Sequence, residues 1–153
     1  ILEKKMESKI FKNRLYGRTK GRSKKKIHLK NYYNLVNKYK INTLNQKTKY
    51  ILDIGTGYGE TSIYFSKKYP QFKIVSCEKY IDGNFNLLKK IQENKINNIK
   101  LYEGNVLDIL DNNNIEKYFE LILIFFPDPW PKKKHNKRRL ISSTFLKKLH
   151  PYI

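Results

Sequence analysis

The stretch "YILDIGTGYGE", residues 50–60, joins an apolar run to a turn that contains three glycines. The first five residues are typical of a buried strand, and Gly55, Gly57 and Gly59 allow the backbone after it to approach a ligand closely. In an α/β sheet, a turn between a strand and a helix lies at the carboxyl edge, where ligands bind. The third glycine of the dinucleotide fingerprint would fall on Glu60. The turn therefore indicates a nucleoside site that is not a dinucleotide site, with a tight turn that holds no ligand as the alternative.

The pattern on both sides of this stretch alternates between helix and strand periods. Apolar residues recur every three or four positions before residue 50 and in two later segments, and short apolar runs lie between them. The last run is apolar almost throughout, as in a parallel strand covered on both faces. Together these features predict an α/β fold, a doubly wound Rossmann-like sheet. The expected elements are helices at 27–40, 60–69 and 83–95, and strands at 50–54, 72–78, 99–104 and 120–126.

Two carboxylates accompany the glycine turn. Glu78 ends the second expected strand, where an acid can bind the hydroxyl groups of a ribose, and Asp53 comes just before the glycines. Two acids at this place repel a pyrophosphate and favour a nucleoside that carries positive charge. The sequence therefore selects against NAD and predicts S-adenosylmethionine, whose sulfonium and ammonium groups are cationic.

The charge of the chain is unevenly distributed. The formal net charge is +20, with 16 basic and 2 acidic side chains in residues 1–52, 9 and 11 in residues 53–128, and 8 and none in residues 129–153. All five arginines lie in the two basic flanks, and their planar guanidinium groups suit phosphate contacts. Two basic flanks around a neutral centre predict a surface that binds RNA or DNA, with a merely solvated, compositionally biased surface as the alternative.

Cysteine use and hydropathy indicate the compartment. The single cysteine, Cys77, cannot form an internal disulfide, and no apolar run is long enough to cross a bilayer. We therefore expect a soluble, cytoplasmic protein with one folded core, and we interpret Cys77 as a buried packing residue. The histidines His28, His135 and His150 lack the spacing of metal ligands, so no metal is expected.

The stretch "FFPDPWPKKKHNKRRL", residues 125–140, places one acid, Asp128, between two prolines and ahead of a basic run. Together with the D-x-G-x-G-x-G turn and the acid of "SCE", this stretch resembles the tRNA (guanine-N7-)-methyltransferase family of class I methyltransferases. The resemblance implies transfer of a methyl group from S-adenosylmethionine to N7 of a guanine in the variable loop of tRNA. It extends from the "YGRTKGR" arm to the end of the chain.

The resemblance also implies roles for individual residues. It divides the chain into a basic arm and helix at 1–48 and a methyltransferase domain at 49–153. It further implies that the family continues past "LKKLHPYI" into more strands, so the fourth strand is expected to be an exposed sheet edge. The implied cofactor contacts are Asp53, Gly55, Gly57, Gly59, Glu78, Asn105 and Asp128, and the implied tRNA contacts are Lys132, Lys134, His135, Asn136, Lys137, Arg138 and Arg139.

Three positions differ from the usual family pattern. Asp53 stands where the family commonly has Glu, Asn105 where it has Asp, and Pro131 where it often has His. A shorter acid and a neutral amide still accept hydrogen bonds, so these changes bear on the affinity for the cofactor more than on its identity.

The chemistry of guanine N7 explains a single acid in a basic segment. N7 carries a free lone pair, so no base has to remove a proton before it attacks the methyl carbon. Attack moves positive charge onto the purine, and a carboxylate at Asp128 would stabilise that charge and hold the base. The alternative role for Asp128 is to cap a following helix. Trp130 either stacks on a base or packs internally.

Two other functions remain open on the sequence. Methyltransferases that act on exocyclic amines of DNA or RNA also place a polar residue, prolines and an aromatic after the fourth strand, although their prolines are adjacent. A non-catalytic RNA-binding protein with a decayed methyltransferase core is the second alternative.

Overall fold

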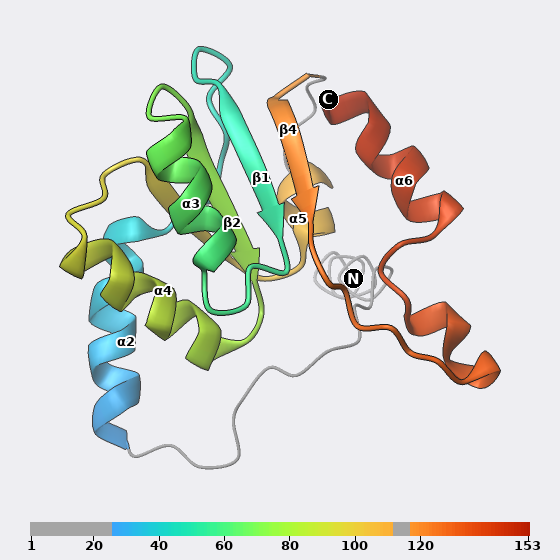
Figure 1. The fold of residues 1–153 in the computed structure, drawn as a ribbon, viewed down its shortest axis with the longest axis horizontal. Coiled ribbons are helices and arrows are strands. Elements are labelled where there is room, and N and C mark those ends of the chain that lie inside the picture. The colour runs from blue at the N-terminus through green and yellow to red at the C-terminus, as the bar shows by residue number, and fades with distance from the viewer. Residues whose placement is uncertain (1–25, 112–116) are drawn as a thin grey trace, which may run out of the picture.

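The computed structural model describes residues 26–111 and 117–153 (Figure 1). The basic arm with Arg14, Arg18 and Arg22 lies outside the described residues. The side chains of residues 26–30 are likewise not described, and His28 is among them.

Within the described residues, four parallel strands form a sheet in the order β3-β2-β1-β4. Their bounds are β1 Tyr50–Ile54, β2 Lys73–Glu78, β3 Ile99–Glu103 and β4 Phe119–Ile124. The chain builds outward from β1 through β2 to β3 and then returns to the other side of β1 to form β4. The order of strands therefore reverses between β1 and β4, and in such sheets ligands bind beyond the carboxyl ends at that point.

Helices cover both faces of the sheet. They are α2 Lys26–Tyr39, α3 Glu60–Lys68, α4 Ile81–Glu93, α5 Val106–Asp111 and α6 Ser143–Leu149, with short 3-10 helices η1 Lys133–Arg138 and η2 His150–Tyr152. One core cluster joins α2, α3 and α4 to one face of the sheet. The other joins α5 and α6 to the opposite face. The doubly wound α/β fold expected from the sequence is thus confirmed.

Alternating strand residues explain the two cores. Leu52 points to the α5 side with Val75, while Ile51 points to the α2 side with Ile74, and all four are almost fully buried. Successive side chains of a strand face opposite sides of the sheet, so a strand covered on both faces must be apolar throughout. This is the pattern that the sequence shows.

The expected helix at 27–40 corresponds to α2. Tyr32 and Val36 are buried against the sheet and α4, as their spacing predicted, whereas Tyr33 is half exposed. Helix α2 belongs to the first expected segment, 1–48. It packs on a face of the sheet that the second expected segment, 49–153, forms. The division of the chain at residues 48 and 49 stays a prediction.

Two boundaries differ from the sequence expectations. Helix α4 begins at Ile81, two residues before the expected start, and α5 occupies a segment for which no helix was expected. A helix of six residues is too short for its apolar repeat to be recognised in the sequence. Tertiary packing stabilises α5, since it buries Val106, Leu107, Ile109 and Leu110.

Strand β4 is the edge of the described sheet next to β1, as expected. Leu121, in the middle of this strand, is 37% exposed. Near the amino ends of β1 and β4, Lys49 and Glu120 form a surface ion pair at 3.0 Å. Within the described residues, no helix is long and apolar enough to cross a membrane.

Candidate functional site

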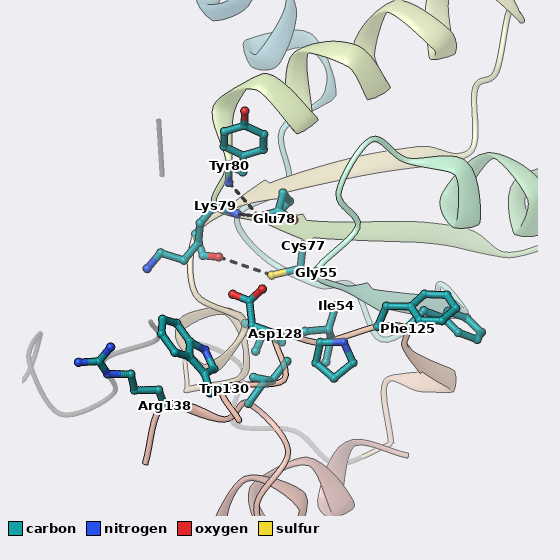
Figure 2. Close-up of a pocket in the computed structure, with 15 residues that line it drawn as sticks. Ile54, Gly55, Cys77, Glu78, Lys79, Tyr80, Phe125, Asp128, Trp130 and Arg138 are labelled. Atoms are coloured by element: carbon teal, nitrogen blue, oxygen red, sulfur yellow. Dashed lines mark hydrogen bonds between the residues drawn. The ribbon is translucent and has the colours of Figure 1, made fainter. Parts of the chain in front are cut away.

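A cavity of about 660 Å³ lies beyond the carboxyl ends of the strands, where β1 and β4 adjoin (Figure 2). Its walls come from the loops after β1, β2, β3 and β4 and from the basic segment that precedes α6. They are formed by Ile54, Gly55, Cys77, Glu78, Lys79, Tyr80, Gly104, Val106, Phe125, Phe126, Pro127, Asp128, Trp130, Arg138 and Leu140.

The glycine turn takes a path that other residues rarely follow. Gly55, Gly57 and Gly59 have φ values of +75°, +59° and +85°, all in the left-handed region. At Gly59 a side chain would also collide with Leu87 of α4, because a Cβ would lie 2.5 Å from its Cδ1. The three glycines thus bring the turn over the end of the sheet and into α3.

Glu78 is fixed by backbone amides. One carboxylate oxygen accepts hydrogen bonds from the N–H groups of Lys79 and Tyr80 at 2.6 and 2.9 Å, and the other accepts one from Gly57 at 3.0 Å. The acid is therefore oriented at the cavity wall before any ligand binds (Figure 2). It also occupies the Gly57 N–H, a donor of the kind that phosphate-binding loops direct at an anion.

Asp53 is placed differently from the expectation. Its carboxylate is only 2% exposed, does not line the cavity, and accepts a hydrogen bond from Ser62 Oγ at 2.7 Å. Ser62 Oγ in turn lies 2.6 Å from Ser76 Oγ. Burial raises the pKa of Asp53 to about 6, while the bond from Ser62 lowers it and the nearby charge of Glu78 raises it.

Asp53 and Thr56 link this buried group to the glycine turn. Thr56 Oγ1 donates to the Asp53 carbonyl at 3.1 Å, and the Gly55 N–H donates to the Cys77 carbonyl at 2.9 Å. In this structure Asp53 therefore supports the turn from beneath, and its direct contact with the cofactor stays a prediction.

Asn105 also supports the site from outside the cavity lining. Its side-chain oxygen accepts the Leu107 N–H at 2.9 Å, and its carbonyl accepts the Asp108 N–H. The residue is 8% exposed and directly precedes α5, while its neighbours Gly104 and Val106 line the cavity. An amide can cap a helix as well as an acid can, which explains why Asn serves at this position.

Asp128 lies on the wall of the cavity with an exposed carboxylate that points toward the end of β1 and β2 (Figure 2). Within the described part of the chain, no hydrogen bond or ion pair to this carboxylate is found. Its alternative role as a helix cap is wrong: η1 begins after Lys132 with no side-chain cap, and α6 is capped by Ser142.

The loop that carries Asp128 has two unusual backbone conformations. Phe126 and Trp130 have φ values of +47° and +38°, which residues with side chains seldom adopt. These two bends turn the chain away from β4 and back across the cavity. Backbone strain of this kind is common at functional sites.

The basic residues divide into two groups. Lys132, Lys134, Asn136 and Lys137 are exposed on or beside η1, away from the cavity lining. Arg138 lines the cavity against Trp130, and Arg139 donates to the Trp130 carbonyl. His135 meets the Trp130 ring edge-on. Trp130 therefore packs against basic side chains at the cavity wall, and its stacking on a nucleobase stays a prediction.

Sequence reasoning did not find every residue of the site. Lys79 and Tyr80 line the cavity directly after Glu78, and their position after a strand was the available signal. Gly83 was missed altogether: a Cβ there would lie 2.3 Å from the Gly57 carbonyl oxygen, so only glycine lets α4 pack against the turn. Nothing in a single sequence distinguishes this glycine from one in an ordinary helix.

Cys77 is buried and its Sγ lies 3.7 Å from the Gly104 carbonyl oxygen, so the packing role expected for it is confirmed. Burial raises the pKa of its thiol far above the ordinary value. Within residues 26–111 and 117–153, no group of three or more His, Cys, Asp or Glu side chains could hold a metal ion.

Comparison with known proteins gives the family. A family model described as "Putative methyltransferase" matches residues 47–153. The tRNA (guanine-N(7)-)-methyltransferase of Polaromonas sp. is 40% identical over 99 residues, which cover 65% of this chain and 40% of that protein. The enzyme of that name from Wolbachia pipientis is 37% identical over 106 residues, covering 67% and 46%, and that from Neisseria gonorrhoeae is 39% identical over 101 residues, covering 66% and 42%.

The matched part of each of these relatives is less than half of its length, so the chain spans under half of the curated proteins that it resembles. The family model nevertheless covers well over half of this chain, including the glycine turn, Glu78 and the segment around Asp128. The chain therefore belongs to this methyltransferase family, that of the tRNA (guanine-N7-)-methyltransferases.

Proposed function

We propose that the protein transfers a methyl group from S-adenosylmethionine to N7 of a guanine in the variable loop of tRNA, position 46 in tRNA numbering. The observation that carries the proposal is the cavity at the switch point of the sheet. It brings Glu78, which ends β2, to the same space as Asp128, which follows β4.

The cavity suits a nucleoside ligand of this kind. Its volume of about 660 Å³ falls within the usual range for small-molecule sites. Glu78 accepts three backbone hydrogen bonds, and a carboxylate has about four acceptor positions, so it retains capacity for a ribose hydroxyl. Because Glu78 also takes the Gly57 N–H, the turn has lost a donor that a pyrophosphate needs. These features favour a cationic nucleoside over NAD.

When bound, S-adenosylmethionine supplies an electrophilic methyl group. Gly55 and Glu78 would hold its nucleoside part, and Asp53, Asn105 and Gly59 would support the loops that carry them. The contact from Asp128 to the cofactor stays a proposal, as do direct contacts from Asp53 and Asn105, which do not line the cavity.

Asp128 would act on the guanine. Its carboxylate is exposed at the cavity wall, and among residues 26–111 and 117–153 it has no bond that would have to be broken before it accepts the N1 and amino hydrogens of the base. As N7 forms its bond to carbon, positive charge develops on the purine, and a fixed negative charge beside it lowers the energy of that state. Holding the two reactants in line supplies most of the remaining acceleration, an effect worth about 7–11 kcal/mol in well-oriented systems.

The tRNA would lie against the basic residues around the cavity. Lys132, Lys134, His135, Asn136, Lys137 and Arg139 flank it on the side of η1, and the basic arm at the start of the chain carries a further set of cations. Cationic side chains displace counterions from the phosphates of the RNA. We place this reaction in the cytoplasm and propose that it needs neither a metal nor a membrane; the oligomeric state is left open.

A labelling experiment tests the proposal. Protein incubated with tRNA and S-adenosylmethionine carrying a labelled methyl group is expected to transfer label to tRNA. The labelled site should cleave under borohydride and aniline treatment, which exposes N7-methylguanine. Label without that cleavage would identify an exocyclic-amine methyltransferase, and tRNA binding without label would identify a non-catalytic binding protein. Either result would exclude the proposed reaction.

Asp128→Asn separates the acid's chemistry from its shape. We expect a large fall in kcat with tRNA binding mostly retained, because the carboxylate stabilises charge that develops during transfer. Single-turnover transfer and filter binding measure the two quantities. Normal turnover in this variant would mean that the acid takes no part in the reaction.

A further inference from the structure

Trp130 contacts three residues of the basic segment that follows it. The Arg138 guanidinium lies over the indole ring, with its Cζ 5.0 Å from the ring centroid. The His135 ring approaches edge-on, with 5.4 Å between centroids and 89° between planes. The backbone carbonyl of Trp130 accepts hydrogen bonds from Nε and Nη2 of Arg139 at 3.3 and 3.2 Å. Trp130 therefore ties η1 to the loop that follows β4.

Two features of Trp130 in this position are energetically unfavourable. Its φ of +38° lies in the left-handed region, and its indole N–H is buried without a hydrogen-bond partner in the described structure. A residue that serves only for packing is not expected to combine a left-handed backbone with a buried indole N–H that lacks a partner. The ring's contacts with cationic side chains are the interactions that compensate for them.

Arg138 is placed differently from its basic neighbours. It lines the cavity together with Trp130 and Asp128, whereas Lys134 and Lys137 of the same helix are exposed and do not. Figure 2 shows the Trp130 ring between the Asp128 carboxylate and the Arg138 side chain. The stacked ring restricts the guanidinium, so the arginine needs less ordering when a ligand binds.

We propose that Trp130 is a positioning residue: it holds Arg138 at the cavity wall so that this arginine binds the target nucleotide, while the exposed lysines bind the outer backbone. The inference rests on the proposed function. Arginine often pairs with O6 and N7 of guanine, but here N7 must stay free to receive the methyl group. Arg138 is therefore assigned to the phosphate of the target nucleotide, which its two terminal N–H groups match in a bidentate pair.

A double-mutant cycle tests the coupling. Trp130→Leu is expected to lower kcat at saturating tRNA by about 10- to 100-fold, because a misplaced reactant costs this much. Trp130→Phe keeps an aromatic face and loses an N–H that has no partner, so it should retain most of the rate. Trp130→Leu combined with Arg138→Ala should be no slower than Arg138→Ala alone, since the tryptophan acts through the arginine.

Two outcomes of the cycle would overturn the inference. The first is a multiplicative loss in the double variant, which would show that the two residues act independently. The second is a Trp130→Phe variant as slow as Trp130→Leu. Thermal unfolding and the affinity for S-adenosylhomocysteine, measured for each variant, separate loss of positioning from loss of folding, because a positioning role leaves both close to the parent values.

Fluorescence tests the placement without catalysis. Trp130 is the single tryptophan of the chain, so its emission reports on this ring alone. Arg138→Ala should uncover the ring and increase its quenching by acrylamide, whereas Lys137→Ala, one residue away and exposed, should not. Unchanged quenching in Arg138→Ala overturns the inference. A parent protein that binds tRNA but transfers no methyl group overturns the proposed function, and increased quenching would still support the placement of Arg138.

Discussion

Glu78 and Asp53 show how two carboxylates at the same edge of a sheet take different roles. Glu78 ends β2, reaches the cavity wall and accepts three backbone N–H groups. Asp53 lies within β1 and points into the layer beneath α3, where two serines and a helix exclude water. The alternation of side chains along a strand decides this difference, because it sends Asp53 to the face opposite to that of Ile54.

Glu78→Gln is expected to weaken the binding of S-adenosylhomocysteine by roughly 10- to 100-fold. Gln has one acceptor oxygen in place of two, so its amide N–H₂ must face either the Gly57 N–H or those of Lys79 and Tyr80. Loss of a charge-assisted bond costs about 1.5–3 kcal/mol. Isothermal titration measures the affinity.

Glu60→Gln is the matched control for this variant, because Glu60 is an exposed acid whose partner is Lys90. It should bind the ligand as the parent does. Equal affinities for the parent and Glu78→Gln would remove Glu78 from the cofactor site.

The raised pKa of Asp53 predicts a dependence of stability on pH. The pKa rises from 3.8 to about 6 on folding, so between these values the folded protein binds more protons than the unfolded chain. The free energy of unfolding contributed by this group therefore falls as pH rises through that window, by up to roughly 3 kcal/mol.

Asp53→Asn removes this dependence. Denaturant unfolding at several pH values should show the variant gaining stability relative to the parent as pH rises from about 4 to about 7. Ser62→Ala should move the window upward, since the Ser62 hydrogen bond lowers the pKa of Asp53. A difference between parent and Asp53→Asn that does not vary with pH would show that Asp53 titrates normally.

Helix α4 and the glycine turn form one unit at the scale of elements. Gly83, in the first turn of α4, lies against the Gly57 carbonyl, and Leu87, one turn later, lies against Gly59. Lys90, a further turn along, donates to the Tyr58 carbonyl at 2.9 Å. Three successive turns of one helix therefore hold the loop that the cofactor is proposed to contact.

Gly83→Ala tests this packing. In an open helix the change would add about 1 kcal/mol of stability, because Ala is the better helix former. Here the new Cβ would lie 2.3 Å from the Gly57 carbonyl oxygen, so we expect a net loss of about 1–3 kcal/mol and weaker binding of S-adenosylhomocysteine.

The exposed position Gln92 of the same helix gives a control, because Gln92→Ala should change stability by less than about 0.5 kcal/mol. Thermal unfolding compares the two variants. A more stable Gly83→Ala would mean that the turn and the helix can separate.

At the scale of the whole molecule, the basic side chains are concentrated in the two flanks of the sequence, around a nearly neutral centre. The described lysines of η1 are exposed beside the cavity, and the acidic side chains lie mostly in the central part of the chain. We therefore propose that a polyanion approaches the cavity from the side of η1.

Lys134→Ala combined with Lys137→Ala is expected to reduce the salt dependence of tRNA binding. Each lost phosphate contact should lower the slope of log K against log salt by between about 0.7 and 0.9, because fewer counterions are released. Filter binding at several salt concentrations measures the slope. Lys67→Ala with Lys68→Ala removes the same charge from the far end of α3 and should leave the slope near that of the parent. Equal slopes in the two double variants would mean that the basic run of η1 does not contact tRNA.

The sequence by itself determined the class of fold, most of the elements and the approximate position of the site. The periods of strands and helices are local properties of the sequence. The preference for glycine at the positive φ values of Gly55, Gly57 and Gly59 is also local, because it does not depend on the rest of the fold. Likewise, the prolines and acid of the segment after β4 are adjacent in the chain, so their grouping needed no knowledge of the fold.

The tertiary structure alone decided which of these residues meet. The order β3-β2-β1-β4 brings the loop after β4 beside the loop after β1, although about 70 residues separate Gly55 from Phe125 in the sequence. The faces of the strands turned Asp53 inward, and the packing of α4 gave Gly83 its role. Trp130 acquired Arg138 as a partner because two left-handed residues bend the loop back on itself. Most of these contacts join distant segments, and a local pattern in one sequence carries no record of them.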